Sequence, residues 1–343
     1  MNVTLKNKQV QIIAECGLSH AGSLSKAKKF IKSVKKNGAD IVKFQTHIAE
    51  KESTYDEKFR IKISKKYKNR YDYWQKTSFS KRQWRELIAY AKKNKIFFLS
   101  SVFSVEAVEL LYDLGQRVFK IGSGEFFSID ILDKIIELNG SMIISTGMST
   151  NIEIMKIIKY LKKKNAKFVL MQCTSSYPCN FLNVNLHMID YFKKKYKCLV
   201  GYSDHTGNLI APILAITKKI SFLECHIQDR VNSSNPDSSS SISLAQLNFL
   251  SNFKKNFYLS EKISSIKHKD RIARILFKNR ILFSKSLALK KSQKKDHIIL
   301  LSNLTMKKPG NGLKMSDLKK ILGKKLIKNK SNLKLLKLSD IEK

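Results

Sequence analysis

The sequence predicts an α/β fold in which a closed (β/α)8 TIM barrel is followed by a small C-terminal β-rich domain. Eight short runs between residues 10 and 227 are almost continuously apolar, as expected for parallel strands buried on both faces. Most of the intervals between them carry an amphipathic helical pattern. Eight strand–helix alternations in about 250 residues match a closed barrel. The first run also lacks the glycine-rich turn of a dinucleotide-binding sheet.

The eight predicted strands cover residues 10–15, 41–45, 96–101, 118–122, 142–145, 168–172, 199–203 and 220–227. The predicted helices cover residues 25–37, 81–94, 105–114, 129–139, 152–164, 184–195, 209–217 and 244–253. Ser149, Thr150 and Asn151 are the candidate N-caps of the helix over 152–164, because their side chains can accept a bond from a free backbone N–H of the first turn.

Two irregular segments interrupt this rhythm. A connection as long as residues 46–80 is usually functional, often a lid, and its aromatic group Tyr71, Tyr73 and Trp74 suits either lid packing or a sugar-stacking face. Residues 232–243 are rich in Ser and Asn. The texture changes near residue 265, so we expect a barrel domain over 1–264, a linker over 265–282 and a small domain over 283–343. After residue 265, short apolar pieces at 281–283, 286–289 and 297–301 alternate with turns.

The charge of the chain is strongly positive, with a formal net charge of +39 over 343 residues. The basic residues are 57 lysines but only nine arginines, whereas proteins that read nucleic acids favour the planar fork of arginine. We therefore expect no nucleic-acid partner. No secretory signal and no membrane-spanning run is recognisable, so no membrane partner is expected. The five cysteines show no metal-finger spacing, which favours reduced thiols and a cytoplasmic location.

Polar residues follow the predicted strands, where the reactive groups of such barrels lie. In chain order they are Glu15; Lys43 and Gln45; Ser100 and Ser101; Lys120, Ser123 and Glu125; Ser145 and Thr146; Gln172, Thr174, Ser175 and Tyr177; Ser203, Asp204 and His205; and Glu224 and His226. A barrel with a purely structural role does not need polar groups at every strand end. This pattern predicts a functional site at the carboxyl end of the barrel.

Lys43 and Lys120 lie inside apolar runs, where a lysine is rarely buried without a partner. Burying an ammonium group costs several kcal/mol unless an anion compensates it. Together with the neighbouring hydroxyls, the two lysines would form a cradle for a phosphate or a carboxylate. The alternative is that they reach solvent or pair with Glu15 or Glu125.

His205 and His226 follow the last two predicted strands, which are neighbours in a closed barrel. Two converging imidazoles can hold a divalent metal whose open positions suit a Lewis acid. A hydrogen-bonded structural role is the alternative, and His20 or His47 could join or replace either residue. Glu15, Glu125, Glu224 and Asp237 are candidate proton carriers, and spacing does not choose among them.

Several motifs occur in the order of one known family. They are Ile12-Ile13-Ala14-Glu15, Ser19-His20-Ala21-Gly22-Ser23, Gly38-Ala39-Asp40-Ile41-Val42-Lys43-Phe44-Gln45-Thr46, Lys120-Ile121-Gly122-Ser123-Gly124-Glu125, Ser145-Thr146-Gly147-Met148, Cys173-Thr174-Ser175-Ser176-Tyr177-Pro178, Gly201-Tyr202-Ser203-Asp204-His205-Thr206 and Leu223-Glu224-Cys225-His226. This set resembles the sialic acid synthase family, which includes legionaminic and pseudaminic acid synthases. Lys307-Lys308-Pro309-Gly310-Asn311-Gly312, with Leu322-Gly323-Lys324, looks like its C-terminal antifreeze-like (SAF) domain.

The resemblance implies condensation of phosphoenolpyruvate with N-acetylmannosamine or a related N-acylated amino sugar, giving a nine-carbon keto acid and phosphate. It implies a divalent metal, typically Mn²⁺ with Mg²⁺ or Co²⁺ as alternatives, bound by His205 and His226. By the same resemblance the catalytic residues would be Glu15, His205, His226 and Asp237. Phosphoenolpyruvate would contact Lys43, Ser101, Lys120, Ser123, Ser145 and Ser203, and the sugar would contact Gln45, Phe103, Ser175, Tyr177 and Lys308. Members of the family are domain-swapped homodimers.

This chain departs from the family pattern at three positions. Lys308 stands where the family usually has an arginine that reaches the sugar in the partner subunit, and lysine lacks its planar fork. Ser19 and Ser175 replace residues that are often asparagine. The accepted sugar is therefore open, and legionaminic and pseudaminic acid synthase activities are alternatives. Two further readings are a relative that acts on a phosphorylated aldose and a non-catalytic anion-binding barrel scaffold.

Overall fold

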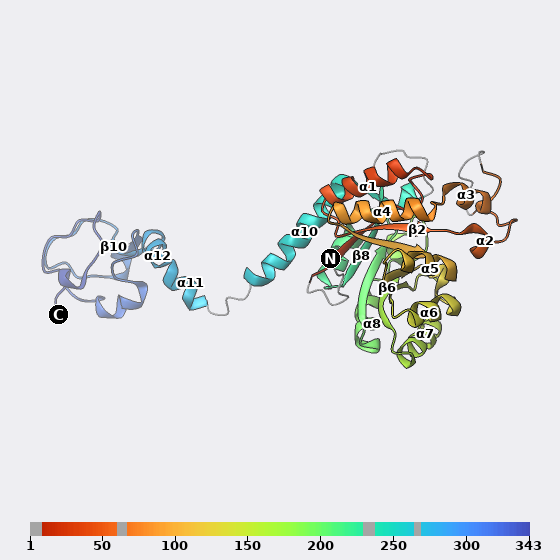
Figure 1. The fold of residues 1–343 in the computed structure, drawn as a ribbon. Coiled ribbons are helices and arrows are strands. Elements are labelled where there is room, and N and C mark those ends of the chain that lie inside the picture. The colour runs from red at the N-terminus through yellow and green to blue at the C-terminus, as the bar shows by residue number, and fades with distance from the viewer. Residues whose placement is uncertain (1–8, 60–66, 229–236, 264–268) are drawn as a thin grey trace. The chain divides into compact units, whose positions relative to one another are not determined.

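The computed structural model describes residues 9–59, 67–228, 237–263 and 269–343. The chain divides into two compact units, Met1–Glu261 and Lys262–Lys343. The first unit is a barrel and the second is a smaller domain, and each is described separately below (Figure 1). Residues 232–236 of the predicted Ser- and Asn-rich segment lie outside the described residues, which resume at Asp237.

Eight parallel strands close into a barrel, which confirms the predicted fold class. The strands are β1 (Gln11–Glu15), β2 (Ile41–Thr46), β3 (Phe97–Val102), β4 (Val118–Ile121), β5 (Ser141–Ser145), β6 (Lys167–Cys173), β7 (Leu199–Asp204) and β8 (Phe222–Gln228). They pair in chain order, and β1 also pairs with β8, which closes the ring. A short strand, β9 (Ser241–Ser243), adds to the carboxyl end of β8.

The predicted helices form and cover the outside of the barrel (Figure 1). They are α1 (Leu24–Lys36), α4 (Lys81–Lys93), α5 (Val105–Asp113), α6 (Ile129–Glu137), α7 (Asn151–Lys163), α8 (His187–Tyr196), α9 (Ile210–Thr217) and α10 (Leu244–Ile263). Of the three candidate caps, Thr150 is the N-cap of α7 and forms a capping box with Glu153. The last helix is longer than predicted, and Lys254 anchors it by donating to Asp40 Oδ2 at 2.6 Å.

The two faces of the strands build two separate apolar layers. Residues that point outward pack against the helices, as Val42, Phe44 and Phe119 do. Residues that point inward fill the lower barrel with Ile13, Ile41, Leu99, Val118, Ile143, Val169, Met171 and Phe222. Because both faces are buried, the strands read as nearly continuous apolar runs in the sequence. Alternation along each strand then places its next inward residue at the carboxyl end of the barrel.

Gly201 of β7 is required by this interior packing. A Cβ atom at this position would lie 2.1 Å from Met171 Sδ and 2.7 Å from the carbonyl oxygen of Phe222. Met171 fills the space that a side chain of residue 201 would need. A larger residue here would displace both the sulfur and the neighbouring strand.

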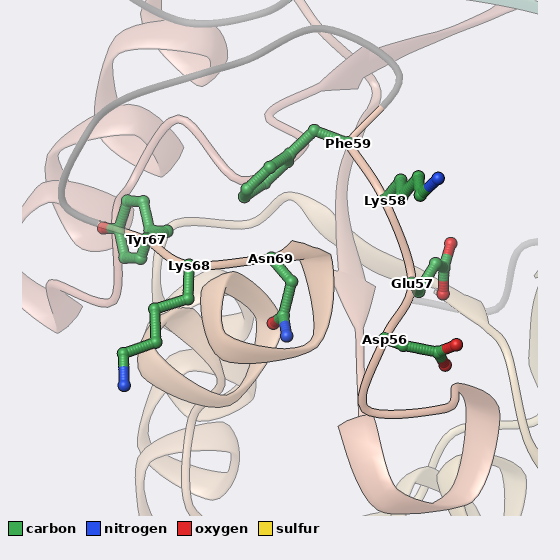
Figure 2. Close-up of a pocket in the computed structure, with 7 residues that line it drawn as sticks. All are labelled: Asp56, Glu57, Lys58, Phe59, Tyr67, Lys68 and Asn69. Atoms are coloured by element: carbon green, nitrogen blue, oxygen red, sulfur yellow. The ribbon is translucent and has the colours of Figure 1, made fainter.

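The connection between β2 and β3 contains two short helices before α4, namely α2 (Ala49–Glu52) and α3 (Arg70–Thr77). Tyr73 and Trp74 of α3 are 8% and 7% exposed and pack with Ala49. Their burial favours a packing role for these two rings over a role as a sugar-stacking face. Figure 2 shows a pocket of about 390 Å³ in this connection, where Phe59 points toward the segment that carries Tyr67 and Asn69.

The second unit has its own apolar core around a two-stranded antiparallel sheet. Strand β10 (Ser286–Leu289) pairs with β11 (Leu304–Lys307). The core residues are Leu287, Leu289, Ile299, Leu304, Ile321, Leu326, Leu336 and Ile341. Asp340 is buried within this unit and forms ion pairs with Lys328 and Lys330. Its assignment as an antifreeze-like domain stays a prediction.

The interval expected as a linker contains two helices in its described part, α11 (Lys269–Ile275) and α12 (Phe277–Phe283). The short apolar piece at 281–283 ends α12, where Leu282 and Phe283 are exposed. Its three apolar residues are too few for periodicity to separate helix from strand.

All five cysteines are free thiols. Among the described residues, no helix is both long enough and apolar enough to cross a membrane.

We predict that Leu87→Ala in α4 lowers the free energy of unfolding by about 2–5 kcal/mol, because Leu87 is 0% exposed in the layer between helices and barrel. Leu182→Ala is the matched control: Leu182 is 89% exposed, so the change should stay within about 0.5 kcal/mol. Urea unfolding of both variants measures the difference. Equal effects would contradict the assigned packing.

Candidate active site

The register of the strands brings the predicted polar residues together at the carboxyl end of the barrel interior. Glu15 lies beside Lys43 on one side and beside His226 on the other. Further round the ring, Ser101 is level with both Gln45 and Lys120. Ser203 is level with Cys173 and Glu224, which completes the ring. A single layer above the apolar interior thus contains most of the predicted site.

Lys43 is the centre of a buried ionic group. Its Nζ lies 3.1 Å from Glu15 Oε2 and 3.3 Å from Glu224 Oε1, and it donates to Ser101 Oγ at 3.0 Å. Ser203 donates to Glu224 Oε1 at 3.2 Å. The alternative of pairing with Glu15 is therefore correct for Lys43. The second carboxylate is Glu224, not Glu125.

Lys120 is less fully compensated. Its Nζ donates to Ser145 Oγ at 2.6 Å and to the carbonyl oxygen of Ile121 at 3.1 Å. The carboxylate of Glu224 lies 4.0 Å away, and no hydrogen bond to a described residue reaches Glu224 Oε2. Lys120 is only 2% exposed, so its charge is held largely by neutral partners.

Burial and neighbouring charges shift the pKa values in this group in opposite directions. Burial raises the pKa of Glu15 to about 7, although Lys43 opposes the shift. Burial would also raise the pKa of Glu224, but Lys120 and Lys43 outweigh it and lower the value to about 2. Burial lowers the pKa of Lys120 despite the charge of Glu224. An additional anion beside Lys120 would therefore favour its charged form.

His205 and His226 converge as predicted, with ring centroids 5.5 Å apart. His205 Nδ1 lies 2.9 Å from the carbonyl oxygen of Thr174, which leaves Nε2 as the nitrogen that a metal would bind. His226 Nδ1 lies 3.6 Å from Asp237 Oδ2. Burial lowers the pKa of His226 to about 4, so its ring is neutral near pH 7, as a metal ligand must be. The ring of Tyr177 lies 4.2 Å from that of His205.

The described residues contain no group of three or more His, Cys, Asp or Glu side chains arranged to hold a metal. Two imidazoles still fit a borderline divalent cation, which would take its other ligands from water or substrate. The alternatives His20 and His47 lie elsewhere. His20 stacks on Phe79 at 4.6 Å, and His47 stacks between Trp74 and Phe103.

A smaller polar cluster lies beside the histidines. Ser123 Oγ accepts from the backbone N–H of Gly147 at 3.0 Å and lies 3.6 Å from Cys173 Sγ. Ser175 Oγ lies 3.7 Å from the same sulfur. A Cβ atom at residue 147 would approach Ser175 Oγ to 2.3 Å, so glycine is needed for this close approach. The predicted residues Ser123 and Ser175 are thus near each other.

The remaining predicted residues lie at two places. Gln45 donates to Glu15 Oε1 at 2.8 Å, and Gly17 lies against both of them and Asp237. Lys308 is in the second unit, where its Nζ lies 5.5 Å from the ring centroid of Phe283. Its expected contact with a sugar stays a prediction.

Sequence reasoning left the bridging role of Glu224 open and missed the pairing of His47 with Glu52. Glu224 carried a usable signal, because it is a charged residue inside an apolar strand, as Lys43 and Lys120 are. The partner of His47 had no such signal, since it depends on the fold of the long connection.

Two buried lysines among hydroxyls and carboxylates at the carboxyl ends of barrel strands define an enzyme-type (β/α)8 barrel suited to a small anionic substrate. A model of the NeuB family matches residues 30–264. The N,N'-diacetyllegionaminic acid synthase of Campylobacter jejuni is 36% identical over 330 residues, which cover 94% of this chain and 97% of that protein. The pseudaminic acid synthase of the same species is 31% identical and covers 94% of each chain.

Among solved structures, the N-acetylneuraminic acid synthetase of Leptospira borgpetersenii, in complex with citrate, superimposes with a TM-score of 0.66. It is 26% identical, and the match covers 79% of this chain and 92% of that one. The chain belongs to the NeuB family, and its relatives are sialic-acid-type synthases.

We predict that Lys43→Met lowers the free energy of unfolding by about 3–5 kcal/mol, because it leaves Glu15 and Glu224 buried without their shared cation. Adding Glu224→Gln should recover part of this loss, so the two effects are not additive. Denaturant titration of the single and double variants tests this. Lys76→Met, which breaks an exposed ion pair with Asp72, is the control and should change little. Strictly additive costs would contradict a shared ionic group.

Proposed function

We propose that this protein condenses phosphoenolpyruvate with an open-chain N-acylated amino sugar to form a nine-carbon keto acid and phosphate. The observation that carries the proposal is the pair of buried lysines at the barrel mouth. Lys120 in particular has only hydroxyl and carbonyl partners within hydrogen-bond distance. Phosphoenolpyruvate offers a carboxylate and a phosphate on one small frame. Binding it would place an anion beside Lys120, whose nearest carboxylate, that of Glu224, lies 4.0 Å away.

The phosphoenolpyruvate side of the site would consist of Lys43, Ser101, Lys120, Ser145 and Ser203, with Ser123 from the neighbouring cluster. Ser101 and Ser145 accept from the two lysines, and Ser203 donates to Glu224. Ser123 accepts from the backbone N–H of Gly147. Such hydroxyls can turn to donate to a phosphate oxygen when it arrives. Because side chains from other strands hold each lysine, the cradle is formed before the substrate binds.

The sugar side would consist of Gln45, Phe103, Ser175 and Tyr177. Carbon 3 of phosphoenolpyruvate attacks the aldehyde carbon of the sugar, water adds at carbon 2, and phosphate leaves with its bridging oxygen. Glu15 is placed to hold or accept a proton from that water, because its pKa of about 7 permits both states near neutral pH. Asp237, next to His226 and Gly17, is the second carboxylate proposed for this role.

His205 and His226 would hold the divalent cation, with Mn²⁺ as the first candidate and Mg²⁺ or Co²⁺ as alternatives. When bound, the cation polarises a carbonyl and orients the two substrates. The protein supplies two imidazole nitrogens at adjacent strand ends and leaves the other positions open. We further propose a homodimer in which Lys308 of a second copy contacts the sugar.

A second candidate acceptor is a diacetamido sugar, as in legionaminic acid synthesis. The 36% identity to the Campylobacter jejuni legionaminic acid synthase over nearly the whole chain favours this candidate. Pseudaminic acid synthesis uses the same chemistry and is favoured less, by 31% identity.

The test is phosphate release from phosphoenolpyruvate with a panel of acceptors, each with and without Mn²⁺. We expect release with at least one N-acyl amino sugar, and loss of release after treatment with a chelator. The panel includes N-acetylmannosamine, its diacetamido trideoxy analogue and a phosphorylated aldose. Release with the phosphorylated aldose alone, or phosphoenolpyruvate binding without release, would contradict the proposal.

A further inference from the structure

His47 directly follows β2 and is buried beside Glu52 of α2, with side-chain exposures of 4% and 3%. Its Nδ1 lies 2.9 Å from Glu52 Oε1, and its Nε2 lies 3.2 Å from Gln45 Oε1. Gln45 Nε2 in turn donates to Glu15 Oε1 at 2.8 Å. These contacts connect the β2–β3 connection to the ionic group in the barrel through a continuous hydrogen-bonded chain.

Both faces of the His47 ring are occupied as well. The ring stacks on Trp74 with a centroid separation of 4.8 Å and on Phe103 at 4.2 Å, with interplanar angles of 15° and 12°. The backbone carbonyl oxygen of His47 accepts a hydrogen bond from Ser78 Oγ at 2.9 Å. With two stacked neighbours and both nitrogens engaged, the imidazole has one orientation available. The ring plane of Phe103 is fixed by the same stack.

The orientation of His47 decides the orientation of the Gln45 amide. A terminal amide presents a donor at one end and an acceptor at the other, and a half-turn exchanges them with little steric change. Here the acceptor end faces His47 and the donor end faces Glu15. The Nε2 hydrogen of His47 is the donor to this amide, whether the other proton lies on Nδ1 or on Glu52.

The second carboxylate oxygen of Glu52 is buried. No described residue forms a hydrogen bond with its buried Oε2. Burial is the main cause of the raised pKa of Glu125. The charge of the nearby Glu52 also raises this pKa. Among the described residues, the carboxylate acceptors Glu52 and Glu125 therefore lie near each other at this end of the site. Hydroxyl and amide N–H groups, which an N-acyl sugar has and phosphoenolpyruvate lacks, are the complementary chemistry.

We propose that the Glu52–His47 pair is a positioning device for the sugar acceptor. It sets the amide of Gln45 and the ring of Phe103, and so controls the affinity for the sugar and not for phosphoenolpyruvate. Lys120 is oriented by Ser145 and by the carbonyl oxygen of Ile121, which lie outside this chain of bonds. Lys43 meets the chain only through Glu15 and is also held by Ser101 and Glu224. This inference rests on the proposed function, since it concerns the acceptor of that reaction.

The decisive variant is His47→Phe, which keeps an aromatic ring between Trp74 and Phe103 but removes both hydrogen bonds. We expect the KM for the amino sugar to rise about tenfold or more, and the KM for phosphoenolpyruvate to change less than about threefold. His47→Gln, whose amide N–H lies near the position of Nε2, should recover part of the sugar affinity. Glu52→Ala should show the same separation of the two KM values.

His187→Phe is the matched control, because His187 is exposed at the start of α8. Its two KM values and its melting temperature should equal those of the wild type. If His47→Phe raises both KM values equally, or neither, the positioning role is wrong. If it does not fold, the comparison of Glu52→Ala with the wild type decides the same question.

One further measurement separates this inference from the proposed function. A wild type that releases no phosphate with any amino sugar would refute the proposed function. The side-chain amide signal of Gln45, identified in a nitrogen-15 spectrum by its loss in Gln45→Glu, reports on positioning without turnover. It should shift in His47→Phe and stay in place in His187→Phe. An unmoved signal in His47→Phe would overturn the inference whatever the activity.

Discussion

Two lysines and two glutamates buried within one ring of strands are the constraint on which the site depends. Glu15 and Glu224 share Lys43. The carboxylate paired with Lys120 is that of Glu224, which lies 4.0 Å away. Charges removed from water must be compensated, and Lys120 has only neutral hydrogen-bond partners, so an anion beside it would be stabilised. The apolar interior below closes the barrel, so the anion can reach these groups only from the carboxyl end.

Much of the fold and part of the site could be predicted from the sequence. The strands are buried on both faces, so each was visible as an apolar run. A charged residue within such a run indicates an inward position at the carboxyl end, and this reasoning placed Lys43 and Lys120 correctly. The two histidines at neighbouring strand ends were found by the same argument. Periodicity could not assign the partner of each lysine, because the pairing with Glu224 depends on which strands become neighbours on closing the ring.

The unpredicted part lies in the connection between β2 and β3. Tyr73 and Trp74 suited either packing or sugar stacking, and only the folded chain shows that both are buried. The sequence offers His47 as an alternative metal ligand, because it does not show what surrounds each histidine in the fold. The structure gives it two stacked rings and a carboxylate. Such contacts join three separate segments, and local sequence patterns do not record them. The short apolar piece at 281–283 does not indicate a helix by itself, because three apolar residues define no period.

The central claim is that the buried lysines form the binding site of phosphoenolpyruvate. Calorimetric titration of phosphoenolpyruvate into the wild type and into Lys120→Met tests it most directly, because it needs neither the sugar nor turnover. The account predicts measurable binding to the wild type and a loss of about a hundredfold or more in the variant, equivalent to about 2.7 kcal/mol. Equal affinity for the two proteins would contradict it.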